Sequence, residues 1–68
     1  MKFEERLCQL REKTGLSQKT TAEKIGITPR QYQRFEAGEQ RPGYDNLIKI
    51  ADHFKVSLDW LTGRSDLK

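Results

Sequence analysis

Cysteine, histidine and long apolar runs are scarce in this sequence. Cys8 is the only cysteine and His53 the only histidine among 68 residues. An intramolecular disulfide is therefore impossible, and a cluster of thiolate and imidazole metal ligands cannot form. No stretch approaches the roughly 20 apolar residues that span a bilayer, and the charged start lacks the apolar segment of a signal peptide. We expect a cytoplasmic, nucleoid-associated protein with no metal, no cofactor and no membrane contact.

The chain is too short for a catalytic cleft between two subdomains. Its 68 residues leave room for one small core. The sequence contains no glycine-rich phosphate loop and no recognisable Ser-His-Asp pattern, so we expect no enzyme. We predict one domain over residues 1–63 and a short flexible tail over residues 64–68, because Gly63 ends the last helical pattern.

Positive charge is concentrated in the middle of the chain. The formal net charge is only +3. Residues 17–34 hold a single acid, Glu23, against the basic residues Lys19, Lys24, Arg30 and Arg34. Basic and acidic residues balance after Gly43. Such a segment is either a solvated helix surface or a surface that faces a polyanion, and charge alone does not decide between them.

Apolar residues recur at helical spacing in five short segments, and strand-like alternation is absent. Phe3, Leu7 and Leu10 would lie on one face of the first segment, which ends at Gly15. Ser17 is a suitable N-cap for the second segment, as Ser57 is for the last. The fourth segment places Leu47, Ile50, Ala51 and Phe54 on one face. The pattern predicts an all-α domain of five helices.

The third segment has the strongest start signal in the sequence. Thr28, Pro29 and Gln31 stand at the N-cap, the first helical position and the third position of the helix. Thr28 can accept from an orphan amide, and Gln31 can reach back to the amide of Thr28. This signal predicts a helix over residues 28–37, closed by Gly38.

The turn between the second and third segments is only three residues long. Ile25-Gly26-Ile27 is too short for antiparallel packing, so the two helices must cross steeply. Gly26 permits the positive φ that this turn needs, while Ile25 and Ile27 fix both helices to one core. Two short helices joined in this way are typical of a helix-turn-helix.

A helical wheel separates two faces of the third helix. Tyr32, Phe35 and Glu36 fall on one side, and the opposite side carries Arg30, Gln33, Arg34 and Ala37. Arginine can donate two hydrogen bonds to guanine, and glutamine can form a pair of hydrogen bonds with adenine. The outer face therefore suits either the major groove of DNA or plain solvent.

The sequence resembles the phage-repressor and Cro (XRE-type) class of helix-turn-helix regulators. The resemblance extends from about Leu7 to Gly63 and rests on the following segments: Leu16-Ser17-Gln18, Ala22, Ile25-Gly26-Ile27-Thr28, Glu36-Ala37-Gly38, Arg41-Pro42, Leu47-Ile48-Lys49-Ile50-Ala51 and Val56-Ser57-Leu58-Asp59-Trp60-Leu61. It implies a compact five-helix, lambda-repressor-like domain whose third helix lies in the major groove. It also implies a homodimer on a two-fold symmetric (palindromic) operator.

The resemblance and the wheel together assign candidate site residues. Base contacts are expected from Thr28, Arg30, Gln33 and Arg34. Phosphate contacts are expected from Ser17, Gln18, Lys19, Gln31 and Arg41. Arg11 and Glu36 match a structural ion pair between the first and third helices. Three positions depart from the family pattern: Pro29 offers no donor, Thr21 replaces an aliphatic residue, and Glu39 stands where basic residues are common.

These features favour a transcriptional regulator, and more specifically a repressor, that reads double-stranded DNA. The dimer would form through the last helix and the adjoining tail, and we expect no small-molecule ligand. A protein-interaction module that uses the exposed residues of the last two helices, around Trp60 and Leu61, is the alternative. RNA binding is disfavoured, because the A-form major groove is too narrow for a helix.

Overall fold

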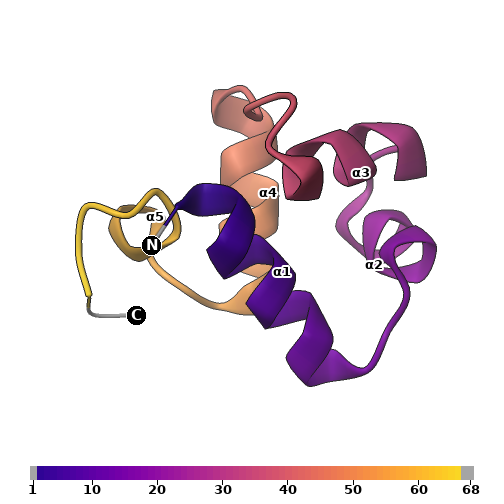
Figure 1. Ribbon diagram of the computed structural model, residues 1–68, viewed down its shortest axis with the longest axis horizontal. Coiled ribbons are helices and arrows are strands. Elements are labelled where there is room, and N and C mark those ends of the chain that lie inside the picture. The colour runs from indigo at the N-terminus through magenta and orange to yellow at the C-terminus, as the bar shows by residue number, and fades with distance from the viewer. Residues whose placement is uncertain (1, 67–68) are drawn as a thin grey trace.

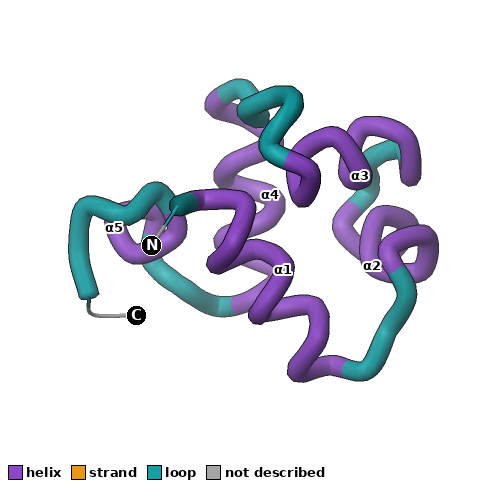
Figure 2. The backbone as a smooth tube through the Cα atoms, in the orientation of Figure 1, coloured by secondary structure: helices purple, strands orange, loops and turns teal. Residues whose placement is uncertain are grey.

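The computed structural model of the chain describes residues 2–66, and helices are its only regular elements in that range. They are α1 (Phe3–Thr14), α2 (Gln18–Ile25), α3 (Pro29–Ala37), α4 (Tyr44–Phe54) and α5 (Leu58–Leu61). The predicted five-helix, all-α architecture is therefore confirmed (Figures 1 and 2). No helix in this range is long and apolar enough to cross a membrane.

Polar side chains begin three of the helices as the sequence predicts. Ser17 Oγ accepts from the third amide of α2 at 3.1 Å. Thr28 Oγ1 accepts from the Gln31 amide at 3.1 Å, and Gln31 Oε1 accepts from the Thr28 amide at 3.4 Å. Ser57 Oγ accepts from the third amide of α5 at 3.0 Å. These caps satisfy amides that have no partner inside their helix, so the helix starts are fixed locally.

Residues in the left-handed region end four of the helices: Gly15, Gly26, Gly38 and Lys55. Gly26 ends α2 with φ +97° and turns the chain into α3, as the sequence predicts. Lys55 ends α4 with φ 57°, although it is not glycine. A residue with a Cβ adopts this conformation at a cost of roughly 1–2 kcal/mol. Two hydrogen bonds hold the turn: the Lys55 amide donates to Asp52, and the Val56 amide donates to Ala51.

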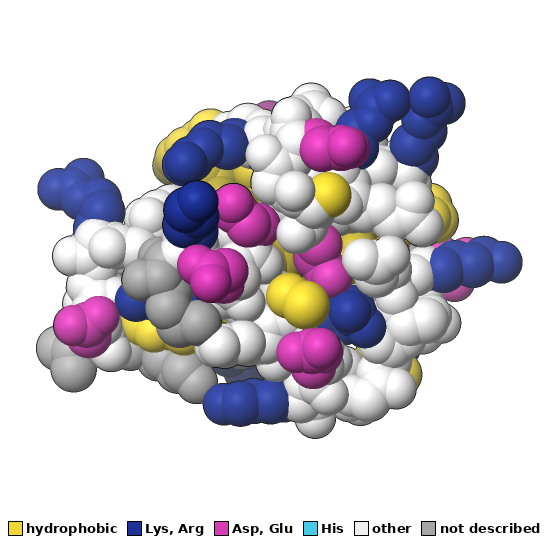
Figure 3. Space-filling model, in the orientation of Figure 1, with side chains coloured by type: hydrophobic (Ala, Val, Ile, Leu, Met, Phe, Trp, Pro, Cys, Tyr) yellow, Lys and Arg dark blue, Asp and Glu magenta, His cyan; other side chains and the backbone are white. Residues whose placement is uncertain are grey.

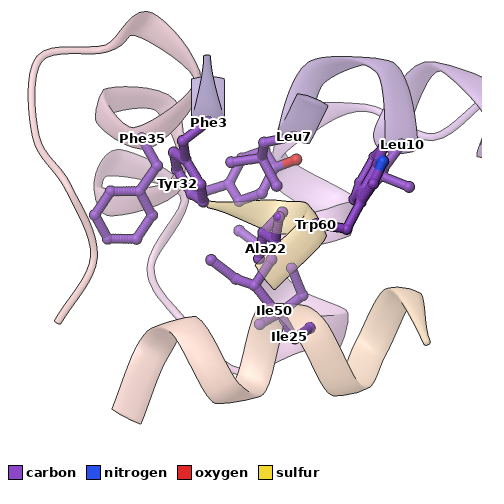
Figure 4. Packing of buried hydrophobic residues seen from close by; sticks show 11 residues of the cluster. Phe3, Leu7, Leu10, Ala22, Ile25, Tyr32, Phe35, Ile50 and Trp60 are labelled. Carbon is purple, nitrogen blue, oxygen red and sulfur yellow. The ribbon is translucent and has the colours of Figure 1, made fainter. Parts of the chain in front are cut away.

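All five helices contribute to one hydrophobic core. Its members are Phe3, Leu7, Leu10, Ala22, Ile25, Tyr32, Phe35, Ile50, Ala51, Trp60 and Leu61. Figure 4 shows Tyr32 and Phe35 of α3 beside Phe3 of α1. Tyr32 and Phe35 are 0% and 1% exposed, so α3 is packed firmly on the core through its inner face. The face that the helical wheel assigned to the interior is the buried one.

The structure corrects the expectation that residues around Trp60 and Leu61 form an exposed surface. Trp60 is 7% exposed and Leu61 is 0% exposed, because both side chains point into the core. The large apolar side chain that α5 exposes to solvent is that of Leu58, which is 36% exposed. Trp60 and Leu61 are therefore core residues, and the exposed large apolar residues of the last two helices are Tyr44 and Leu58.

A buried arginine, which sequence reasoning missed, holds the end of the chain against α1. Arg6 is 4% exposed, and its guanidinium carbon lies 4.7 Å from the centre of the Trp60 ring. Its Nη1 donates to the Trp60 carbonyl and, at 2.9 Å, to the Ser65 carbonyl. Its Nη2 lies 3.3 Å from the Asp66 carboxylate.

Residues 64–66 were expected to belong to a flexible tail. In the structure, contacts with Arg6 and the donation of the Arg64 amide to the Asp59 carbonyl at 2.7 Å place these residues against the domain. Residues 67 and 68, the rest of that tail, lie outside the described residues.

Candidate nucleic-acid interface

Helices α2 and α3 form the helix-turn-helix at one end of the molecule, away from α5 (Figure 1). Gly26 makes the sharp turn between them. Ile25 is buried and Ile27 packs against the core from the side, so both ends of the turn are anchored. The two helices are therefore held in a fixed relative orientation, with the outer face of α3 left free.

The outer face of α3 is exposed along its length. Arg30, Gln33 and Arg34 are all exposed, on the side opposite Tyr32 and Phe35. In Figure 3, Lys and Arg side chains project from the surface over α3. An open hollow of about 480 Å³ lies along this face, and its lining residues are Gln18, Arg30, Gln33, Arg34, Glu36, Ala37 and Glu39. Three of the four predicted base readers thus share one concave surface.

Thr28, the fourth predicted base reader, lies at the N-terminal end of α3. Its side chain is exposed, but its Oγ1 already accepts from the Gln31 amide as the helix cap. Its hydroxyl hydrogen remains available as a donor.

Glu36 connects α3 to both preceding helices. Its Oε2 accepts from Arg11 Nε at 2.7 Å, and its Oε1 accepts from Gln18 Nε2 at 3.0 Å. The Arg11 guanidinium also donates to the Leu16 carbonyl at 3.0 Å, which ties in the loop before α2. The side chains of Arg11 and Glu36 are 18% and 5% exposed. One carboxylate therefore fixes α3 relative to α1 and to the start of α2.

The surroundings of Glu36 stabilise its ionised form. Burial opposes ionisation, but hydrogen bonds outweigh it and lower the pKa of Glu36, with Arg11 as the strongest donor. The Tyr32 hydroxyl lies near the same carboxylate and also lowers its pKa, although the two groups form no hydrogen bond of standard geometry. Burial, reinforced by Glu36, raises the pKa of Tyr32, which stays protonated. The pair of Arg11 and Glu36 is therefore fully charged at neutral pH.

The predicted phosphate contacts fall into separate places. Ser17, Gln18 and Lys19 lie together at the start of α2, and Gln18 also lines the hollow. Gln31 is exposed and closes the cap of α3. Arg41 is exposed in the loop between α3 and α4, beside a small cleft of about 90 Å³ rather than the hollow.

The positions that depart from the family pattern have distinct surroundings. Thr21 is 0% exposed, and its hydroxyl is buried without a hydrogen-bond partner. Glu39 is exposed and lines the hollow beside Arg34. Tyr44, which sequence reasoning did not single out, is 72% exposed at the first position of α4.

Comparison with known proteins agrees with this geometry. The sequence model of the helix-turn-helix family matches residues 9–61. The cryptic phage CTXphi transcriptional repressor RstR of Vibrio cholerae is 42% identical over 64 residues, which are 94% of this chain and 57% of the repressor. The HTH-type transcriptional regulator YqaE of Bacillus subtilis is 41% identical over 59 residues, 87% of this chain and 51% of that protein.

The fold has a match among solved structures. The P22 c2 repressor, in a complex with a synthetic operator, superposes with a TM-score of 0.88 at 22% identity, over 96% of this chain and 98% of that one. The predicted repressor-like fold is therefore confirmed. The chain belongs to the helix-turn-helix family, and it spans about half the length of the curated relatives it matches.

Proposed function

We propose that this domain binds double-stranded DNA in a sequence-specific manner and regulates transcription, as a repressor that occupies its operator. The observation that carries the proposal is the outer face of α3. Arg30, Gln33 and Arg34 line one open hollow there, while Glu36 holds the same helix to α1 and α2. To read base edges, a helix must present exposed hydrogen-bond donors and must itself be held rigidly.

The proposed reading mode places α3 in the major groove. Arg30 and Arg34 would each donate two hydrogen bonds to a guanine, and Gln33 would pair with an adenine edge. Each such contact contributes about 1–3 kcal/mol of discrimination against a wrong base. Thr28, at the N-terminal end of the helix, would add a contact from its hydroxyl. The directional contacts therefore lie on the exposed turns of α3.

Phosphate contacts would set the position of α3 on the duplex. Ser17, Gln18 and Lys19 lie at the start of α2, where the first amides have no partner inside the helix. Gln31 and Arg41 would contact the phosphate backbone of the DNA, one beyond each end of the reading face. Such contacts contribute affinity and register but carry no sequence information.

A dimer on a two-fold symmetric operator would double the reading surface. One short helix covers only a few base pairs, and two copies about 34 Å apart contact successive major grooves on one side of the duplex. The dimer surface would be α5 with the adjoining residues, where Leu58 is exposed. The site of action would be the cytoplasm, at the nucleoid.

Selection from a pool of random duplexes at moderate salt tests the proposal. The expected result is a two-fold symmetric motif with guanines in each half-site. Retention of DNA without any motif would mean that the basic face binds only the backbone. Binding that is insensitive to salt would contradict DNA as the partner, because phosphate contacts release counterions.

A further inference from the structure

We infer that Glu39 is a base-reading residue that selects cytosine next to the position read by Arg34. This inference rests on the proposed function and names one more residue of the same site. It starts from the placement of Glu39: this side chain lines the hollow together with Arg30, Gln33 and Arg34, instead of lying with Arg41 beside the separate cleft.

The backbone fixes Glu39 relative to Arg34. The Glu39 amide donates to the Arg34 carbonyl at 3.0 Å, across Gly38 at φ +77°. This is the 6→1 hydrogen bond of a Schellman motif, which gives the residue after the helix end a defined position. Glu39 is therefore an extension of the rigid reading face rather than part of a loose loop.

The Glu39 carboxylate is available to a ligand. Glu36, the other acid of the hollow, is held by Arg11 and Gln18. Among the residues that the structure describes, Glu39 forms no ion pair with Arg30 or Arg34, and it is exposed. The hollow thus presents arginine donors and one free carboxylate acceptor on a single concave surface.

This combination complements the major-groove edges of two adjacent G·C pairs, with the guanine of one facing Arg34 and the cytosine of the next facing Glu39. Guanine presents the acceptors O6 and N7, which suit arginine, and cytosine presents the N4 amino donor, which suits a carboxylate. Adenine also presents an amino donor, but its N7 acceptor lies beside it and repels an anion. The chemistry therefore selects cytosine. Phosphate offers no donor and would only repel Glu39.

The test compares the base preferences of two variants with those of the wild-type protein. Glu39→Ala should remove a cytosine preference of about 5- to 150-fold at one position per half-site. Glu39→Gln should shift that preference toward adenine, because an amide both donates and accepts. Glu23→Ala is the matched control, since Glu23 is an exposed acid on α2 outside the hollow. It should leave every base preference unchanged.

Two results would overturn the inference. One is a uniform rise in affinity for all duplexes with an unchanged base profile, which would mean that Glu39 acts only by repelling phosphate. The other is the same loss of cytosine preference in Glu23→Ala. Failure of the proposed function is distinguishable from both, because the wild-type protein would then select no motif at all.

Discussion

Replacing Glu36 with glutamine should strongly destabilise the domain. The change keeps the shape of the side chain but removes the charge that Arg11 meets at 2.7 Å. Leaving one member of a buried ion pair unpaired costs about 3–5 kcal/mol. The Arg11 side chain remains 18% exposed, so water partly solvates its unpaired charge. We therefore expect a loss of unfolding free energy at the lower end of that range, about 3 kcal/mol. A domain of this size has a total stability of roughly 3–10 kcal/mol.

Urea unfolding followed by far-ultraviolet circular dichroism measures the effect. The control is Glu12→Gln, which removes an exposed acid from the same helix as Arg11 and should change stability by less than about 0.5 kcal/mol. If Glu36→Gln unfolds at the same urea concentration as the control, the carboxylate does not hold α3 in place and the reasoning fails.

The difference in the free energy of unfolding between the wild-type protein and Glu36→Gln should depend on pH with a defined sign. The pKa of Glu36 is lowered in the folded state, so its stabilisation is complete above the pKa of an unfolded glutamate, about 4.3. The stabilisation is lost as the pH falls through the lower, folded-state pKa. The stability gap between wild type and Glu36→Gln should therefore be constant near neutral pH and narrow only under acid conditions. A gap that widens on acidification would contradict the assigned cause.

Four further substitutions test the roles of other residues in DNA binding and in stability. Arg34→Ala should relax base preference at one position per half-site, and an unchanged selected motif would argue against its role. Lys19→Ala should weaken binding to all duplexes alike and reduce the slope of log affinity against log salt by about 0.9, as measured in a salt titration. Thr21→Val should raise the free energy of unfolding by about 1 kcal/mol, since it removes a buried hydroxyl without a partner. Arg6→Met should lower the free energy of unfolding by roughly 1.5–3 kcal/mol in the same urea assay, because the buried guanidinium donates to two carbonyls.

Local signals in the sequence were enough to predict the helices and the exposed face of α3. The caps at Ser17, Thr28 and Ser57 each bond an amide three residues further along the chain, so each can be predicted from the neighbouring sequence. The turn at Gly26 and the inner face of α3 follow from glycine geometry and from helical periodicity. The pair of Arg11 and Glu36 came from the family resemblance, since the two residues lie 25 positions apart.

Features that depend on distant contacts were not predictable in this way. Arg6 lies among charged residues in the sequence, and its partners are 54 to 60 positions away. Tyr44 follows the apolar spacing of α4, yet it stands at the first position of the helix, beyond the edge of the core, and is exposed. Lys55 ends α4 in a conformation that glycine usually adopts, so no stop signal marked that position. Glu39 appeared only as a departure from the family pattern until the structure placed it beside Arg34.

We expect the outer face of α3 to distinguish one DNA sequence from others. The most direct test is the ratio of two dissociation constants at one salt concentration, for the selected motif and for a duplex of the same composition in scrambled order. The motif should bind at least about 1,000-fold more tightly, the lower end of the range for specific DNA-binding proteins. A ratio near one would contradict it, because binding would then depend on backbone charge alone.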